Sequence, residues 1–342
     1  MEKKKTKNTQ ATRLLSLQRR VLGLTSRHND AIKVVSELQA ELAARSSLEK
    51  VKEILVPHKY QITKSSQKDA VAIGVASDWH IDEKVNSEEI GGLNEFNLKI
   101  AEKRAEIFFT RFLKLLELCR GGSNIDVAIL ALLGDFISGW IHPELIESST
   151  ISPPEALLKV YELLLSGLKF IADKGNLKEL IIIGACGNHG RITAKPRHKG
   201  RVKKSYEWIL YEFLARSLAN TRYASIIKFK LPNGYFNRIS VYDTSLRFHH
   251  GDNIRYYGGV GGIHIPLRKA IAQWDKAIHA DIDIMGHWHT REASEDYVLN
   301  GSLIGYSEYA ESIKADYRKP QQSFFILHPK YGKTAEFPII LE

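Results

Sequence analysis

Two pairs of polar residues in this sequence have the spacing of metal ligands on an extended chain. Asp78 and His80 are separated by one residue, and so are His287 and His289. Alternate residues of an extended segment point to the same side, so each pair can present two donor atoms to one place. Carboxylate and imidazole groups together suit divalent ions such as Mn, Fe and Zn. A single pair of this kind is more often a surface or hydrogen-bonded pair. A metal site is therefore indicated only if further candidate ligands occur elsewhere in the chain.

Further polar residues of the same types follow other apolar segments. They are Asp135 after 125–134, Asn188 and His189 after 177–186, His249 at the end of 238–249 and His250 directly after it. In an α/β sheet the carboxyl ends of the strands form the ligand crevice, so these distant residues would meet at one edge. They offer more donors than one ion needs, which suggests two ions that share a carboxylate. Two-metal sites clamp both the attacking and the leaving oxygen of a phosphoryl group.

The ordered series D-x-H, GD, GNH, HG and GHxH resembles the calcineurin-like metallophosphoesterases over residues 71 to about 310. Among them it is most similar to the exonuclease-type and phage-encoded members. The resemblance implies a layered α/β/β/α sandwich and in-line attack on phosphorus by water activated at the metals. It implies that one ion is held by Asp78, His80 and His289 with Asp135, and the other by Asn188, His250 and His287, with Asp135 bridging.

The resemblance also implies that His189 is not a ligand. It would stabilise the transition state or protonate the leaving oxygen, a role that suits an imidazole. Two departures from the family pattern affect which subfamily the sequence resembles, but they do not affect the expected metal ligands. Gly190 stands where members often carry an acid, and the GD motif reads "GDFISG" where many phosphatases have a longer acidic or Arg-bearing version.

Several neighbours of these motifs have an expected structural role. His250 is chosen over His249 as the ligand because it directly precedes glycine, and His249 is then expected to pack on the opposite face of the strand. Trp79 and Trp288 lie between paired ligands, so they should point away from the metals and cover the site. The segment "NGS" at 300–302 resembles the strand that follows GHxH in the family, so it is interpreted as structural.

The elements that must position these residues alternate between strand and helix in the first part of the chain. Buried-strand runs are predicted at 71–77, 125–134 and 177–186, and amphipathic helices at 93–120, 152–175 and 205–220, with Ser152 as an N-cap. Shorter strands follow at 226–232, 238–249 and 280–285, with a helix around 266–278, and hairpin material fills the C-terminal third. This order predicts a layered α/β domain.

Three regions are expected along the chain. Residues 1–56 form a basic, helical N-terminal extension, 57–70 a linker and 71–342 the catalytic domain. Apolar residues spaced by three and four between Leu14 and Leu42 predict a helix. This helix could form a coiled-coil homodimer, or it could fold back on its own catalytic domain.

The composition is that of an ordinary globular protein, with 342 residues, 44% of them hydrophobic and 26% charged. Its two cysteines imply no disulfide framework and suit a reducing compartment. No apolar run approaches the roughly 20 residues of a membrane helix, and no signal-peptide stretch follows the N-terminus. We therefore expect a cytoplasmic protein that does not insert into a membrane.

The net charge of +10 is concentrated in the N-terminus and in the run 191–204, which has seven Lys or Arg and no acid. Such a balance favours a polyanionic partner. Arg191, Lys195 and Arg197 are candidate substrate-binding residues, and Tyr256 and Tyr257 could stack on bases.

The leading hypothesis is a two-metal phosphodiesterase with nuclease-like activity on DNA or RNA. Manganese is the favoured ion, with Fe, Zn or Mg as alternatives. A second hypothesis is a phosphatase or phosphodiesterase for a small nucleotide or a phosphoprotein, in which case the basic run would be peripheral. A third is a non-catalytic assembly or binding module that acts through the N-terminal helix.

Overall fold

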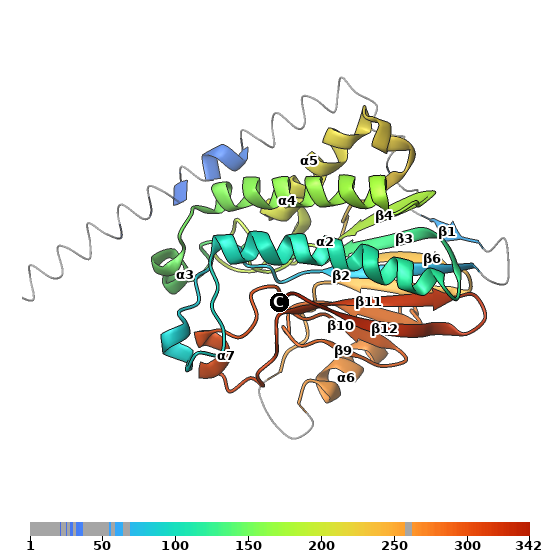
Figure 1. Ribbon diagram of the computed structural model, residues 1–342. Helices are drawn as coiled ribbons and strands as arrows, with labels where there is room; N and C mark the ends of the chain where they lie inside the picture. The colour runs from blue at the N-terminus through green and yellow to red at the C-terminus, as the bar shows by residue number, and fades with distance from the viewer. Residues whose placement is uncertain are drawn as a thin grey trace, which may run out of the picture.

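The computed structural model describes residues 21, 25, 28–29, 32–36, 55, 59–63, 69–256 and 262–342 (Figure 1). Within these ranges two six-stranded mixed sheets are stacked on each other, with helices on the outer side of each. The layered α/β/β/α sandwich that the sequence predicted is thus confirmed for the described part of the chain.

The first sheet has the strand order β12-β11-β2-β3-β4-β5. Its four strands β2 to β5 run parallel, and β11 joins β2 antiparallel and forms a hairpin with β12. The strands are β2 (Asp69–Ala76), β3 (Asn124–Leu132), β4 (Glu179–Gly184), β5 (Ile227–Lys230), β11 (Gln321–His328) and β12 (Gly332–Ile340). The strands predicted from the sequence at 71–77, 125–134 and 177–186 are β2, β3 and β4, three adjacent interior strands of this sheet.

The second sheet has the order β1-β6-β7-β8-β10-β9. Its strands are β1 (Gln61–Ile62), β6 (Asn237–Val241), β7 (Thr244–His249), β8 (Ile282–Met285), β9 (Glu292–Ala293) and β10 (Tyr297–Leu299). Strands β7, β8 and β10 are parallel neighbours, so β7 and β8 end at the same edge. This edge lies beside the carboxyl ends of β2, β3 and β4.

Alternating side chains on the central strands build two separate cores. In β2, Val71, Ile73 and Val75 pack between the two sheets, whereas Ala72 and Ala76 face the helices. Both faces are apolar because both are covered, which is why these strands appear in the sequence as continuous hydrophobic runs.

Helices α2 (Leu98–Arg120), α4 (Pro153–Lys174) and α5 (Tyr206–Ala219) cover the first sheet, and α6 (His264–Asp275) covers the second (Figure 1). Helix α2 begins at Asn97, whose side chain accepts the N–H of Ile100 at 3.1 Å. Helix α4 begins after Ser152, the predicted N-cap, whose N–H is accepted by Glu155 at 2.8 Å. Two short helices, α3 (Pro143–Ser148) and α7 (Glu308–Ser312), and three 3-10 turns, η2 (Ser87–Ile90), η3 (Val202–Lys204) and η4 (Arg222–Ser225), lie in the connections.

Most of the predicted extension 1–56 lies outside the described residues. Residues 32–36 are helical, and Val35 is 1% exposed within the core that underlies α2, α4 and α5. The range 57–70, predicted to be a linker, contains β1, which pairs in parallel with β6. Part of that range therefore belongs to the second sheet, and β2 already begins at Asp69.

Among the described residues, no helix combines the length and the apolar character that crossing a membrane requires. Neither cysteine forms a disulfide; Cys186 is buried, and Cys119 is half-buried.

Candidate metal centre

The polar residues that the motifs single out gather where five strands end. Asp78 and His80 follow β2, Asp135 follows β3, Asn188 and His189 follow β4, His250 follows β7, and His287 and His289 follow β8. The first three strands belong to one sheet and the last two to the other. The site therefore lies at the shared carboxyl edge of the two sheets, as the strand-end argument predicted.

One group of donor atoms is formed by Asp78, His80 and His289. A donor atom from each lies within 4.8 Å of the others. His289 Nε2 is 3.4 Å from Asp78 Oδ1. His80 Nε2 is buried and has no hydrogen-bond partner. An imidazole nitrogen left without a partner in a buried site is what a metal ligand would show, because the ion supplies the missing bond.

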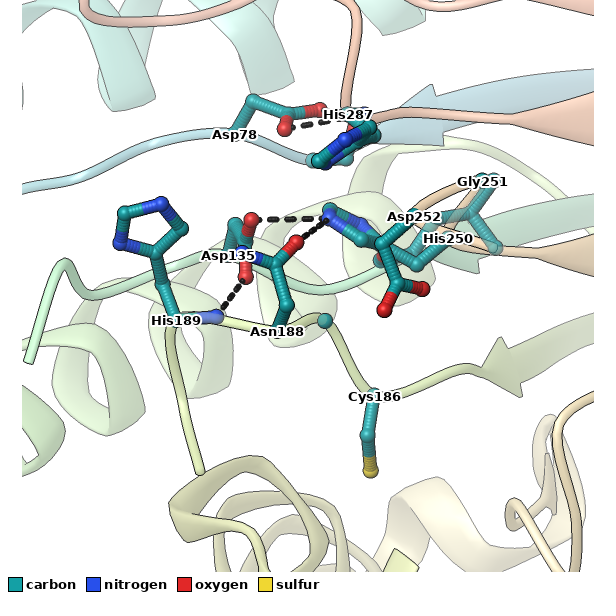
Figure 2. A network of polar contacts seen from close by, with 12 residues as sticks. Asp78, Asp135, Cys186, Asn188, His189, His250, Gly251, Asp252 and His287 are labelled. Carbon is teal, nitrogen blue, oxygen red and sulfur yellow. Dashed lines mark hydrogen bonds and ion pairs between the residues drawn. The ribbon is translucent and has the colours of Figure 1, made fainter. Parts of the chain in front are cut away.

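A second group is formed by Asp135, His250 and His287, again with one donor atom each within 4.8 Å. His250 Nε2 is 2.8 Å from Asp135 Oδ2 and 3.1 Å from Asn188 Oδ1, which brings Asn188 to the same point (Figure 2). Figure 2 also shows Asp78 next to His287 of this group. The backbone N–H of His287 donates to both Asp78 oxygens at 3.0 Å, so the two groups adjoin.

Hydrogen bonds on the far ring nitrogen orient two of these imidazoles. Ser138 Oγ donates to Glu83 and lies 2.8 Å from His80 Nδ1, so it accepts the Nδ1 proton. His250 Nδ1 is 2.7 Å from the Leu133 carbonyl, which can only accept. In both rings Nδ1 is therefore a donor, and Nε2 is the nitrogen that faces the site, where it could bind a cation in place of a proton.

The electrostatics of the site keep its carboxylates charged. Burial would raise the pKa of Asp135, but His250 and His189 hold that pKa well below its usual range. Burial likewise opposes ionisation of Asp78, and the hydrogen bond with His289 lowers its pKa. Burial lowers the pKa of His250, yet the charge of Asp135 outweighs it and raises that pKa to about 10. The carboxylates thus attract positive charge at the position where a cation would bind.

The backbone at the site is held in an unusual conformation. Of the eight described non-glycine residues with positive φ, five are members of the two groups, namely Asp78 (56°), His80 (48°), Asp135 (53°), His287 (73°) and His289 (50°). Left-handed backbone is uncommon for residues with a Cβ and carries strain. Such strain clusters at functional sites, where the surrounding structure imposes it.

Two glycines permit the close approach of these segments. A Cβ on Gly187 would lie 2.0 Å from Asp135 Oδ1, and one on Gly286 would lie 2.5 Å from Asp78 Oδ2. Any side chain at either position would displace a candidate ligand, which explains the glycines of the GNH and GHxH motifs.

Two buried carboxylates that the sequence analysis missed fasten the loops together. Glu207 accepts the N–H of Phe136 at 3.0 Å and that of Gly187 at 2.6 Å, and so joins the loop after β3 to the loop after β4. Asp82 accepts the N–H groups of Ser138 and Gly139 at 2.7 and 3.1 Å. Burial raises the pKa of each to about 7. A Cβ on Gly190 would approach the Glu207 carboxyl carbon to 2.9 Å, so the acid from α5 occupies the space beside Gly190.

His189 lies beside the donor groups and is itself oriented by the loop after β3. Its backbone N–H donates to Asp135 Oδ1 at 2.8 Å. Its Nδ1 is 3.0 Å from the Ser138 carbonyl and must donate to it, which leaves Nε2 for a ligand. The ring stands 4.8 Å from that of His80, and neither donor group includes it.

The candidate substrate-binding residues are only partly brought together. Arg191 and Arg197 line a pocket that also contains Asn188, whereas Lys195 is exposed and does not line it. The pocket includes three charged residues that the sequence analysis did not single out, Arg201, Lys204 and Asp252.

The neighbouring aromatic residues and histidine take the expected structural positions in most cases. Trp79 is buried among Phe108, Phe109 and Phe136, away from the donor atoms. His249 is buried 3.2 Å from Asp283, on the other side of β7 from the site. Trp288 is half-buried against His287 and the exposed ring of Tyr256, and Tyr257 lies outside the described residues.

The fold and the site together define an α/β/β/α sandwich with two adjoining groups of histidine and aspartate at the shared edge of its sheets. No protein-family model matches the chain, and no curated protein is similar to it.

Several solved structures resemble it at a distance. One is wild-type Vps29 complexed with zinc from Entamoeba histolytica, with a TM-score of 0.32 and 12% identity over 79% of this chain and 99% of that one. Another is the hypothetical protein PH1004 from Pyrococcus horikoshii OT3, with a TM-score of 0.38 and 11% identity over 80% and 89%. A third is a protein serine/threonine phosphatase from Saccharomyces cerevisiae, with a TM-score of 0.30 and 11% identity over 90% and 92%. The likeness to each of them is distant.

Proposed function

We propose that this protein is a metal-dependent phosphoesterase that hydrolyses phosphodiester bonds with two divalent ions and acts on DNA or RNA. The observation that carries the proposal is the pair of adjoining donor groups, each built from one aspartate and two histidines. Two adjoining ions of this kind are suited to clamp the oxygens of a phosphoryl group during displacement.

The residues present fit such ions. Asp78, His80 and His289 would hold one ion, and Asn188, His250 and His287 would hold the other, with Asp135 shared between them. The buried, unpartnered Nε2 of His80 supports this assignment, as does the bond of His250 Nδ1 to the Leu133 carbonyl. Mixed nitrogen and oxygen donors suit Mn, Fe or Zn, with Mg a weaker fit, and Mn²⁺ is the ion we propose.

The bound ions would supply Lewis-acid activation of water and neutralise charge on the phosphoryl oxygens. The chain's own residues would do the rest. His189, held through Nδ1, can carry a proton on Nε2 and deliver it to the leaving oxygen. Arg191 is half-buried beside Asn188, where its guanidinium can donate to a phosphate oxygen.

The charge beside the site favours a nucleic acid over a neutral or singly charged substrate. The run 191–204 carries seven Lys or Arg and no acid, and it leaves directly from the GNH turn. Basic residues that contact several phosphates supply most of the affinity of non-specific nucleic-acid binding.

The test is cleavage of end-labelled single- and double-stranded DNA and RNA by the purified protein with added Mn²⁺. Metal-dependent cleavage is expected, with a loss of about 100-fold or more in His250→Ala, because the variant removes a donor that no neighbour replaces. An EDTA control should abolish it. Hydrolysis of bis-p-nitrophenyl phosphate without cleavage of any polymer would instead support a small phosphodiester substrate. No hydrolysis of either would contradict the proposal.

A further inference from the structure

A shallow, open hollow adjoins the second donor group. It shares Asn188 with that group, and it contains Asp252, which comes two residues after His250. A molecule that fills it would therefore lie directly beside a group reacting at the metal centre. The charged side chains that line it are those of Arg191, Arg197, Arg201, Lys204 and Asp252.

The hollow has an excess of positive charge. Four of its lining residues are cationic and one is anionic. The single acid, Asp252, is already committed to Arg201 through two bonds of 2.8 and 2.9 Å. Arg201 also donates to the Cys186 carbonyl, and its guanidinium stacks on the Tyr235 ring at 5.0 Å. These contacts hold its side chain in one position at the side of the hollow.

The other three cations form no ion pair within 4.0 Å in the ranges that the structure describes. Arg191 donates Nε to the Thr193 carbonyl and Nη1 to the Asn188 carbonyl, so neither of these bonds is made to a carboxylate. Arg197 and Lys204 are exposed, and neither forms an ion pair there. An arrangement of this kind attracts an anion with several oxygens, and phosphate matches the planar donors of arginine.

The loop that bears these cations is closed on itself. The N–H of Ile192 donates to the Lys204 carbonyl at 3.0 Å, and Arg191 and Ser205 form a β-bridge. The N–H of Tyr206 donates to the Gly190 carbonyl at 2.8 Å, and Val202 is 7% exposed. The ends of the loop are thus tied to each other and to the protein, so Arg191 and Lys204 are held close before a ligand arrives.

We infer that this hollow, the anion pocket, binds the phosphate next to the one that reacts, so that the substrate is a nucleic-acid strand with at least two phosphates. This inference rests on the proposed function and specifies its substrate. A phosphate monoester, or an isolated phosphate on a protein, would leave the anion pocket empty. A strand places an anion there whenever its neighbouring linkage is at the metal centre.

The first test compares substrates that differ by one phosphate. The turnover of bis-p-nitrophenyl phosphate and of the dinucleotide TpT is measured against that of pTpT and TpTp, with Mn²⁺. One of the two extended dinucleotides should be cleaved about 10-fold faster in kcat/KM than TpT, which corresponds to one good phosphate contact. Lys204→Ala and Arg197→Ala should remove this gain, because each lowers kcat/KM for the extended dinucleotide more than for bis-p-nitrophenyl phosphate. Lys199→Ala, an exposed lysine of the same loop outside the anion pocket, should retain the gain.

The second test measures binding without catalysis. The affinity for a fluorescent ten-residue oligothymidylate is followed by anisotropy in EDTA over a series of salt concentrations. The slope of log K against log salt should fall by about one in Lys204→Ala and in Arg197→Ala but not in Lys199→Ala.

The outcomes separate the two proposals. If bis-p-nitrophenyl phosphate is hydrolysed but the added phosphate has no effect, the anion pocket is refuted and the phosphoesterase remains. If the salt slopes respond to Lys204→Ala but nothing is hydrolysed, the proposed function fails while the binding surface stands. Identical behaviour of Lys204→Ala and Lys199→Ala in both tests would overturn the inference.

Discussion

His189 is the residue at which proton transfer and metal binding can be separated experimentally. Its ring is fixed by Ser138 and its backbone by Asp135, yet it belongs to neither donor group. We predict that His189→Gln lowers kcat on a dinucleotide by about 10²- to 10⁴-fold, the usual effect of losing a general acid. The metal content, measured by atomic emission, should stay at the wild-type value.

The leaving group provides the control for this prediction. p-Nitrophenolate departs without a proton, so the loss on bis-p-nitrophenyl phosphate should be much smaller than the loss on the dinucleotide. Equal losses on both substrates would mean that His189 acts by positioning or by charge and not as an acid.

At the scale of elements, a buried cluster of Arg247, Asp283 and His249 connects β7 to β8 next to the site. Arg247 on β7 donates to both oxygens of Asp283 on β8 at 2.7 and 2.8 Å, and all of these side chains are fully buried. Burial alone would raise the pKa of Asp283, but hydrogen bonds from His249 and Arg247 lower it. The cluster fixes the two strands whose ends present His250 and His287.

This cluster makes a prediction for acid stability. Because the folded-state pKa of Asp283 is depressed, the unfolded chain binds its proton first as the pH falls. The stabilisation is therefore complete above the unfolded pKa of about 3.9 and is lost as the pH falls below it. Asp283→Asn should reduce the free energy of unfolding at pH 7 by about 3–5 kcal/mol, since it leaves Arg247 buried without its main partner.

The measurement is urea unfolding at several pH values between 3 and 7. The stability of Asp283→Asn should depend less steeply on pH below about 4 than that of the parent protein. Asp243→Asn, a substitution of an exposed aspartate in the turn between β6 and β7, serves as the matched control. If both variants behave alike, the cluster does not stabilise the strands.

The elements that carry the motifs could be predicted because their signals are local. An apolar run that ends in Asp135 or Asn188 is visible within ten residues of sequence. Glu207 was missed because its partners, Phe136 and Gly187, lie on other elements. One signal was present: Glu207 lies on the same stripe of α5 as Tyr211, Leu214 and Leu218, where an acid is out of place unless it is hydrogen-bonded.

Other features depend on contacts that no short pattern encodes. Strand β1 has two residues, too few for a detectable alternation, and it exists because β6 offers a free edge. Arg201 pairs with Asp252, which lies 51 positions away in the sequence. The two charges neutralise each other, so the net charge of the anion pocket comes from its other cations. The basic run alone could not show that Lys204 lines this pocket and Lys195 does not.

At the scale of the whole molecule, the described part of the N-terminal helix packs on its own chain. Val35 is 1% exposed within the helix-side core, whereas the adjacent Val34 is 41% exposed. This contrast favours the fold-back arrangement over a coiled-coil homodimer, which would leave the stripe exposed in a single chain.

We predict that Val35→Asp lowers the free energy of unfolding by at least about 1.5–3 kcal/mol, the burial energy of one valine, because a carboxylate cannot remain in that core. Val34→Asp should change it by less than about 0.5 kcal/mol. Urea unfolding tests the stabilities, and light scattering tests the oligomeric state. A dimer that Val34→Asp or Val35→Asp converts to monomer, with unchanged monomer stability, would contradict the fold-back arrangement.

The wide spacing of the donors along the chain has a consequence for how the protein would acquire its ions in a cell. Asp78 and His289 meet only when both sheets are complete, since one follows β2 and the other follows β8. A nascent chain on the ribosome offers at most a local D-x-H or H-x-H pair, which holds an ion weakly. Selection among Mn, Fe and Zn would therefore occur after synthesis, between a finished cavity and whichever ions the compartment keeps free. The same polypeptide could then be loaded with different ions in hosts or growth media that differ in their free-metal levels.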